Sequence, residues 1–236
     1  MDLALPSGPT LHVVLVLIAV TLAYVIQHYL GRSQWLKERT RLADPELSQA
    51  RAIYGARIVG GLVLGGVPGL LAWSLPGPLG FAFPLARPTL LFWAIVLLLV
   101  LPTVAASMHR PAAWSAYPPV RFARWDLDRL LVNGLTWGVY LCGYELCFRG
   151  VLLFGLAPAL GDWPALAVMT AIYVLVHLDK PASEAVGTLP MGFVFGLSAL
   201  YSGSFLPAFL AHWVIAVTSD LAAIRANPSL TFGRPS

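Results

Sequence analysis

The chain has 236 residues, of which 58% are hydrophobic and only 11% are charged, and its formal net charge is +4. Because a soluble domain carries about a quarter charged residues, this composition excludes an ordinary soluble protein and indicates an integral membrane protein. Six Lys and Arg residues lie from Arg32 to Arg57, and four Arg residues lie from Arg110 to Arg129. Clusters of this kind flank membrane spans on the cytoplasmic side. They are explained as juxtamembrane charge, and no nucleic-acid partner is predicted.

Three apolar runs in the first half predict membrane spans over residues 10–30, 57–73 and 89–108, since about 20 apolar residues are enough to cross a bilayer. The first run follows a segment without Lys or Arg, so we interpret it as a retained helix with its N-terminus outside rather than a signal peptide. The second is rich in glycine, which allows helices to pack closely. The basic segment 32–52 is expected at the cytoplasmic interface.

Four more apolar runs follow, over residues 130–161, 163–177, 184–201 and 205–223. One crossing for each run gives about seven spans, or eight if residues 151–160 form a separate segment. The predicted fold class is therefore all-α, a polytopic transmembrane helical bundle of about seven or eight spans. The basic loops and the C-terminus are predicted to face the cytoplasm.

Glu145 and Arg149 are the only charged residues between positions 130 and 161. An ionisable side chain inside a membrane span is costly and usually faces the protein interior, is paired, and has a function. The two residues are four positions apart with the glutamate first, which is the favourable order for an ion pair on one helical face. The competing interpretation is a structural ion pair that fixes helix packing.

The last three apolar runs carry His177, Glu184, His212 and Asp220. With Glu145, the two histidines could activate water, the carboxylate acting as general base and a histidine sharing the proton. The other histidine could donate to a developing oxyanion. The same three side chains could instead bind zinc, although no HExxH motif favours a metal. A single histidine is more often a packing residue, and we expect Asp220 to anchor the cytoplasmic end rather than take part in catalysis.

Three short patterns follow one another on successive predicted helices. They are Tyr144-Glu145-Leu146-Cys147-Phe148-Arg149-Gly150, then Tyr173-Val174-Leu175-Val176-His177, and then His212-Trp213-Val214-Ile215-Ala216. Over about residues 130–223 they resemble the motifs of the CPBP intramembrane proteases, which include CAAX-prenyl endopeptidases and bacteriocin-processing or self-immunity proteins. The family patterns are Glu-Glu-x-x-x-Arg, Phe-x-x-x-His, and His-x-x-x-Asn or a small residue. Tyr144 and Tyr173 depart from these patterns, and the last position of the third pattern holds the small residue Ala216.

The resemblance implies an intramembrane endopeptidase that hydrolyses a peptide bond of a membrane-associated or lipid-anchored protein, in the bacterial inner membrane. It also implies that a motif glutamate and the second-motif histidine activate water, without a cofactor, zinc being the alternative. The chain is divided into N-terminal helices and basic loops (1–126), a CPBP-like catalytic core (127–225) and a short polar tail (226–236). The candidate catalytic residues are Glu145, Arg149, His177, His212 and Glu184.

Tyr144 stands where the family has its leading glutamate, which is usually assigned as the base, and this departure leaves several readings open. Glu145 could act as the base with Arg149 orienting it, although a carboxylate tied to an arginine is a weaker base. Glu184 could instead supply the missing carboxylate. The alternatives to a protease are a non-catalytic membrane binding or immunity factor of the same fold, and a small-molecule or proton-coupled transporter, in which buried charges would relay protons.

Overall fold

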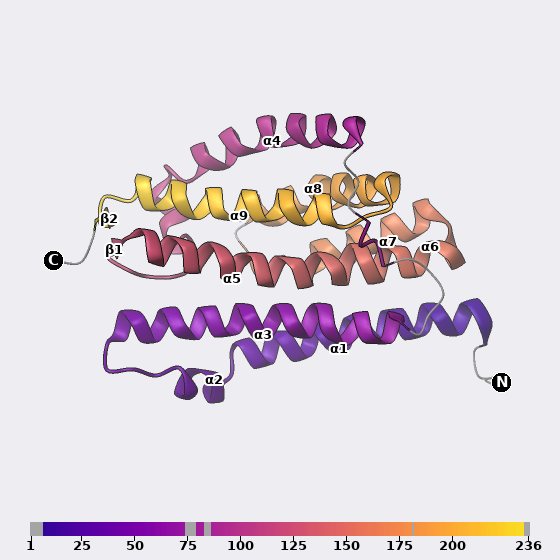
Figure 1. Cartoon of the computed structure of the whole chain (residues 1–236), viewed down its shortest axis with the longest axis horizontal. Coiled ribbons are helices and arrows are strands. Elements are labelled where there is room, and N and C mark those ends of the chain that lie inside the picture. The colour runs from indigo at the N-terminus through magenta and orange to yellow at the C-terminus, as the bar shows by residue number, and fades with distance from the viewer. Residues whose placement is uncertain (1–6, 74–78, 83–85, 181, 234–236) are drawn as a thin grey trace.

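The structure of the chain is a computed structural model that describes residues 7–73, 79–82, 86–180 and 182–233. It is a bundle of helices with one small parallel sheet (Figure 1). The helices are α1 (Gly8–Gly31), α2 (Gln34–Arg39), α3 (Pro45–Trp73), α4 (Arg87–Ser107), η1 (Pro111–Ser115), α5 (Leu127–Glu145), η2 (Leu146–Leu153), α6 (Phe154–Leu160), α7 (Asp162–Leu175), α8 (Ala182–Ser202) and α9 (Leu206–Ala226). The strands β1 (Arg124–Trp125) and β2 (Thr231–Phe232) pair with each other.

Six helical segments of the described chain are long and apolar enough to cross a membrane, which confirms the all-α polytopic bundle and an integral membrane protein. They are Gly8–Gly31, Pro45–Leu70, Arg87–Ser107, Leu127–Leu160, Glu184–Ser202 and Leu206–Ala226. The predicted span over residues 163–177 is the 14-residue helix α7, about 21 Å long, which is shorter than a hydrocarbon core of about 30 Å. Residues 151–160 form no separate span, because α5, η2 and α6 continue as one segment of 34 residues.

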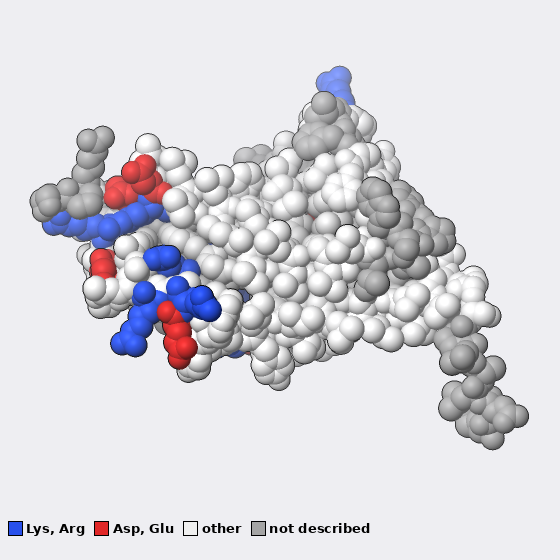
Figure 2. All heavy atoms as spheres, turned by 60° about the horizontal axis from the view of Figure 1, so that its bottom comes forward, with Lys and Arg blue, Asp and Glu red and all other residues white. Residues whose placement is uncertain are grey.

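Charged side chains gather at one end of the bundle, where α2, the start of α3 and the two strands lie (Figures 1 and 2). The long flank beside them in Figure 2 is almost free of charge, as expected for a surface in contact with lipid. The first helix starts at the opposite end from this charged end, and α9 ends at it (Figure 1). The two basic clusters of the sequence therefore come together on one side of the bundle, as the cytoplasmic prediction requires.

The basic segment over residues 32–52 is more ordered than the sequence predicts. Ser33 caps α2 by accepting a hydrogen bond from the Leu36 backbone N–H at 3.2 Å. Pro45 opens α3, and Asp44 accepts a hydrogen bond from the Leu47 N–H at 3.1 Å. Proline and a short acceptor side chain are typical of helix starts. The second span thus begins 12 residues before the predicted position 57.

The helices α3 and α5 approach each other very closely just before Glu145. A Cβ atom added to Gly143 would overlap the carbonyl group of Gly61, and one added to Gly61 would overlap the backbone of Val139. Only glycine allows two backbones to lie this close, which is how small residues bring membrane helices together. The end of α5 therefore packs with its backbone directly against the backbone of α3. The largest hydrophobic cluster surrounds the segment that follows, η2.

Candidate active site

The helix that carries Glu145 and Arg149 changes its winding between them. Glu145 ends α5, and the π-helix η2 begins at the next residue and contains Arg149. In a π-helix the backbone hydrogen bonds run from i to i+5, and such segments are frequent at functional sites. Both side chains are completely buried. The predicted ion pair is present, with Arg149 Nη1 at 2.9 Å from Glu145 Oε2.

Glu145 has a second partner that comes from the far end of the chain. Its Oε1 lies 2.6 Å from Nδ1 of His212 on α9. The guanidinium of Arg149 lies over the ring of Tyr173 at 4.4 Å and near the ring of Phe195 at 5.5 Å. In the described part of the chain it has no polar partner besides the ion pair with Glu145. Since a buried charge needs compensation, Glu145 is the group that neutralises Arg149.

The two histidines carry the ring proton on the same nitrogen, Nδ1. His177 follows the end of α7 and brings its Nδ1 within 2.7 Å of the carbonyl oxygen of Tyr173. A carbonyl only accepts, so this Nδ1 carries the proton and Nε2 keeps its lone pair. Burial lowers the pKa of the His177 imidazole, which favours this neutral form. His212 donates its Nδ1–H to Glu145, and its side chain is 19% exposed, so its Nε2 is the nitrogen left for other contacts.

Tyr144, at the position of the missing glutamate, lies between the two histidines. The centroid of its ring is 6.1 Å from that of His177 and 6.0 Å from that of His212, and both contacts are edge-on. Its ring also stacks on Phe148 at 4.5 Å. The side chain is 4% exposed, and its hydroxyl is buried without a hydrogen-bond partner among the described residues. The position therefore contributes an aromatic wall and no carboxylate.

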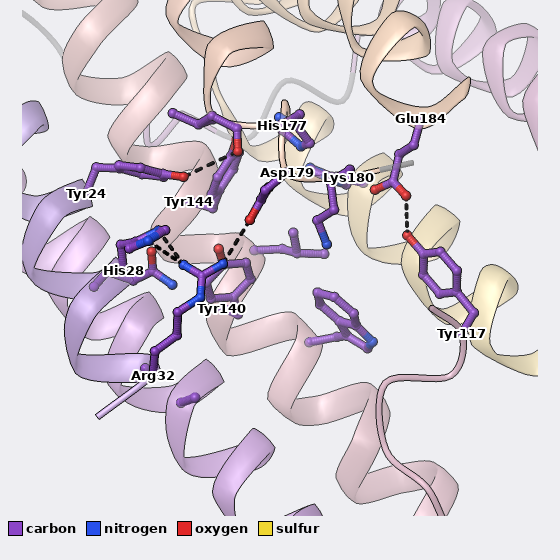
Figure 3. Close-up of a pocket in the computed structure, with 17 residues that line it drawn as sticks. Tyr24, His28, Arg32, Tyr117, Tyr140, Tyr144, His177, Asp179, Lys180 and Glu184 are labelled. Carbon is purple, nitrogen blue, oxygen red and sulfur yellow. Dashed lines mark hydrogen bonds and ion pairs between the residues drawn. The ribbon is translucent and has the colours of Figure 1, made fainter. Parts of the chain in front are cut away.

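A cavity of about 300 Å³ lies beside the two histidines and Tyr144, and Arg32 and Asp179 also line it (Figure 3). Its wall includes His177, His212, Tyr144 and Glu184, whereas Glu145 and Arg149 are not among the residues that line it. His177 reaches the cavity because the chain leaves the helix at Leu175 and forms a turn before α8. Irregular backbone is tolerated at such a depth where it lines a cavity.

Glu184 lines the same cavity but has a different partner from Glu145. The hydroxyl of Tyr117 donates to Glu184 Oε2 at 2.8 Å (Figure 3). Burial first, and then the charge of Glu184, raise the pKa of Tyr117 above its usual range, so the tyrosine remains a hydrogen-bond donor. The contacts of the structure thus group Glu145, Arg149 and His212 together, and they hold Glu184 against Tyr117 elsewhere on the wall.

The alternative zinc set does not come together as a metal site. Within the ranges that the structure describes, no group of three or more His, Cys, Asp or Glu side chains could hold a metal ion. Glu145 and His212 form a pair, and His177 does not join them in such a group.

A second buried polar cluster lies between the site and the charged end, and the sequence indicates only one part of it. Asp220, expected as an anchor at the cytoplasmic end, accepts hydrogen bonds from Asn133 and from Trp137, both at 2.8 Å. Arg57 donates to Asn133 at 2.8 Å and lies 4.0 Å from Asp220. This cluster ties α3, α5 and α9 together. The spacing of Asn133 and Trp137, four residues apart in an apolar run, is the signal that could have identified it.

The fold and the site define an integral membrane helical bundle in which a buried glutamate, an arginine and two histidines meet beside a cavity. Residues 130–218 match the model of a family described as type II CAAX prenyl endopeptidase Rce1-like. This match covers the same part of the chain as the three motifs, and it supports their resemblance to the CPBP proteases. Comparison with curated proteins and comparison with solved structures gave no match.

Proposed function

We propose that this protein is an intramembrane endopeptidase of the CAAX type, which hydrolyses a peptide bond in a membrane-associated or lipid-anchored protein. The family match over residues 130–218 and the six membrane spans support this class of activity. The observation that carries the proposal is the contact of 2.6 Å between the buried Glu145 and His212, whose ring lines the cavity. A carboxylate that orients a histidine beside an accessible space is a recurring arrangement for general base catalysis.

In this proposal Glu145 orients the base rather than acting as the base itself. Its side chain is completely buried and does not line the cavity, whereas His212, which it contacts, does. The carboxylate accepts the Nδ1–H of His212, which leaves Nε2 to take a proton. Arg149 fixes the other oxygen of Glu145 at 2.9 Å. Glu145 and Arg149 are thus positioning residues, in the way that a buried carboxylate holds a catalytic imidazole.

The reaction then follows from the states of the two imidazoles. His212 Nε2 removes a proton from a water molecule in the cavity, and the oxygen of that water attacks the scissile carbonyl carbon. His177 cannot donate from Nε2 in its neutral form, so it accepts a hydrogen bond from the same water and directs it. The protonated His212 returns its proton to the departing amine as the C–N bond breaks. This assignment replaces the oxyanion role that the sequence suggests for one of the histidines.

The test is proteolysis of model peptides by the purified protein in lipid nanodiscs. The peptides carry a cysteine near the C-terminus, with and without a farnesyl group, and the variants are Glu145→Gln, His212→Gln, His177→Gln and Glu184→Gln. We expect the first two to lose at least a hundredfold in kcat, since a positioned general base contributes about 10²–10⁴. Glu184→Gln should lose much less. If Glu184→Gln is the inactive variant and Glu145→Gln is active, the assigned carboxylate is wrong.

A non-catalytic binding or immunity factor is the second candidate, and Tyr144 is the observation that favours it. The family pattern has a glutamate there, whereas this chain has a buried aromatic side chain in contact with both histidines. A wild-type protein that binds the peptides but cuts none of them would support this candidate over the protease.

A further inference from the structure

The turn that carries His177 is attached to the first helix of the chain. Tyr24 of α1 donates a hydrogen bond from its hydroxyl to the carbonyl oxygen of Val176 at 3.3 Å. Arg32, just after the end of α1, places Nη2 at 2.9 Å from Asp179 Oδ2. The two contacts lie on either side of His177 along the chain, and Figure 3 shows both of them at the cavity.

The attachment uses one face of α1. Tyr24 and His28 are four residues apart and Arg32 follows after four more, so they lie in one row. All three line the cavity. The rings of Tyr24 and His28 are 6.0 Å apart, and the guanidinium of Arg32 contacts the His28 imidazole at 2.6 Å. Tyr24 and His28 therefore pack in a line behind Arg32, and the contact with His28 holds the Arg32 side chain toward the turn.

The other contacts of His177 are the tyrosine rings beside it and the bonds of its own turn. It lies outside regular helix, between the end of α7 at Leu175 and the start of α8 at Ala182. In the described chain its side chain makes one hydrogen bond, to Tyr173, and its backbone bonds to Val174 and Lys180 stay within the turn. A residue in a short turn moves with the turn, so whatever fixes Val176 and Asp179 also fixes the imidazole between them. The structure assigns that task to α1.

We propose that Tyr24 and Arg32 are positioning residues for His177: they clamp the 176–180 turn against α1 and so keep the imidazole on the cavity wall with Nδ1 on Tyr173. The catalytic meaning of this clamp rests on the proposed function. The clamp lies partly outside residues 130–218, the part of the chain that matches the family model. The N-terminal helix is therefore part of the site and not only a membrane anchor.

The expected effects are modest and can be estimated. The side chains of Arg32 and Asp179 are 58% and 49% exposed, and an ion pair that exposed to solvent changes an equilibrium by a factor of about 1.5 to 5. We expect Arg32→Gln to lower kcat by about that factor, and Tyr24→Phe by a similar one. The double variant should lose about tenfold, with KM little changed. Salt should reduce the difference between Arg32→Gln and wild type, because it screens the exposed pair.

The test has one readout that does not depend on catalysis. The protein is labelled with ¹⁵N-histidine in nanodiscs, and the His177 signals are assigned with His177→Gln. At pH 8, where an ordinary imidazole is neutral, the ¹⁵N shifts report which ring nitrogen carries the proton. In wild type we expect Nδ1 of His177 to carry it. In Tyr24→Phe/Arg32→Gln we expect a mixture of both tautomers, because the ring leaves the Tyr173 carbonyl.

Two further variants make the test specific. The charge swap Arg32→Asp with Asp179→Arg should restore the wild-type tautomer and kcat relative to Arg32→Asp alone, which a general loss of stability would not do. Lys37→Gln, at the exposed Lys37 of the neighbouring α2 and away from the cavity wall, should match wild type. The clamp is refuted if the double variant has the wild-type tautomer. If the tautomer shifts as expected but wild type cuts no peptide, the clamp is supported and the proposed protease function is contradicted.

Discussion

Replacing Glu145 with glutamine should destabilise the protein strongly, and the structure allows the size of the effect to be stated. The substitution keeps the shape of the side chain and removes its charge. Arg149, also completely buried, then keeps a positive charge beside the rings of Tyr173 and Phe195, without a carboxylate partner among the described residues. Breaking a buried ion pair by removing one partner costs about 3–5 kcal/mol. We expect a loss of that order in the free energy of unfolding.

The double variant Glu145→Gln/Arg149→Met separates this charge effect from other causes. Because it removes both charges and keeps an apolar side chain of similar length, it should recover most of the lost stability while remaining inactive. The assay is unfolding in mixed micelles with increasing denaturing detergent, followed by circular dichroism. The matched control is Asp179→Asn, which breaks the exposed pair with Arg32 and should cost less than about 1 kcal/mol. If Glu145→Gln is as stable as this control, the two charges do not depend on each other and the reasoning is wrong.

Four other predictions follow from particular features. A methyl group on Gly143 would overlap the backbone of α3, so Gly143→Ala should cost about 1–3 kcal/mol in the same unfolding assay, whereas Gly66→Ala, with open space around it, should match wild type. Asp220→Ala should cost about 3–5 kcal/mol, since it leaves Arg57 buried without its carboxylate; Arg57→Met in the same chain should recover part of this. Burial lowers the pKa of His177, so its neutral form persists below its ordinary pKa of about 6.5, and the unfolded chain takes up this proton first. Stability should therefore fall as the pH drops below about 6.5, and kcat/KM should fall as the catalytic imidazoles become protonated. A rate that is constant from pH 8 to pH 5 would contradict a role for neutral imidazoles. Activity should be unchanged after dialysis against EDTA. A loss of activity that added zinc restores would favour the zinc alternative.

The sequence correctly predicts what depends on local chemistry. The length of the apolar runs is enough to identify a membrane bundle, and the i, i+4 spacing is enough to pair Glu145 with Arg149, because both sit on one stretch of helix. It does not predict the early start of α3, since the turns from Pro45 are polar enough to resemble an interfacial loop. It also places the end of α7 too late, at residue 177, because hydropathy alone does not show that the chain leaves the helix at Leu175.

The amino-acid sequence by itself determined the class of protein, the order of its spans and the two charges inside one of them, since these follow from composition and from neighbours along the chain. Only the tertiary structure decided which residues from distant parts of the chain contact the side chains of the site. Glu145 meets His212 from α9, Glu184 is held by Tyr117, and the turn with His177 is fixed by α1. These contacts join residues that are 67 to 152 positions apart, so they depend on how the helices pack and where each ends, which no local pattern specifies.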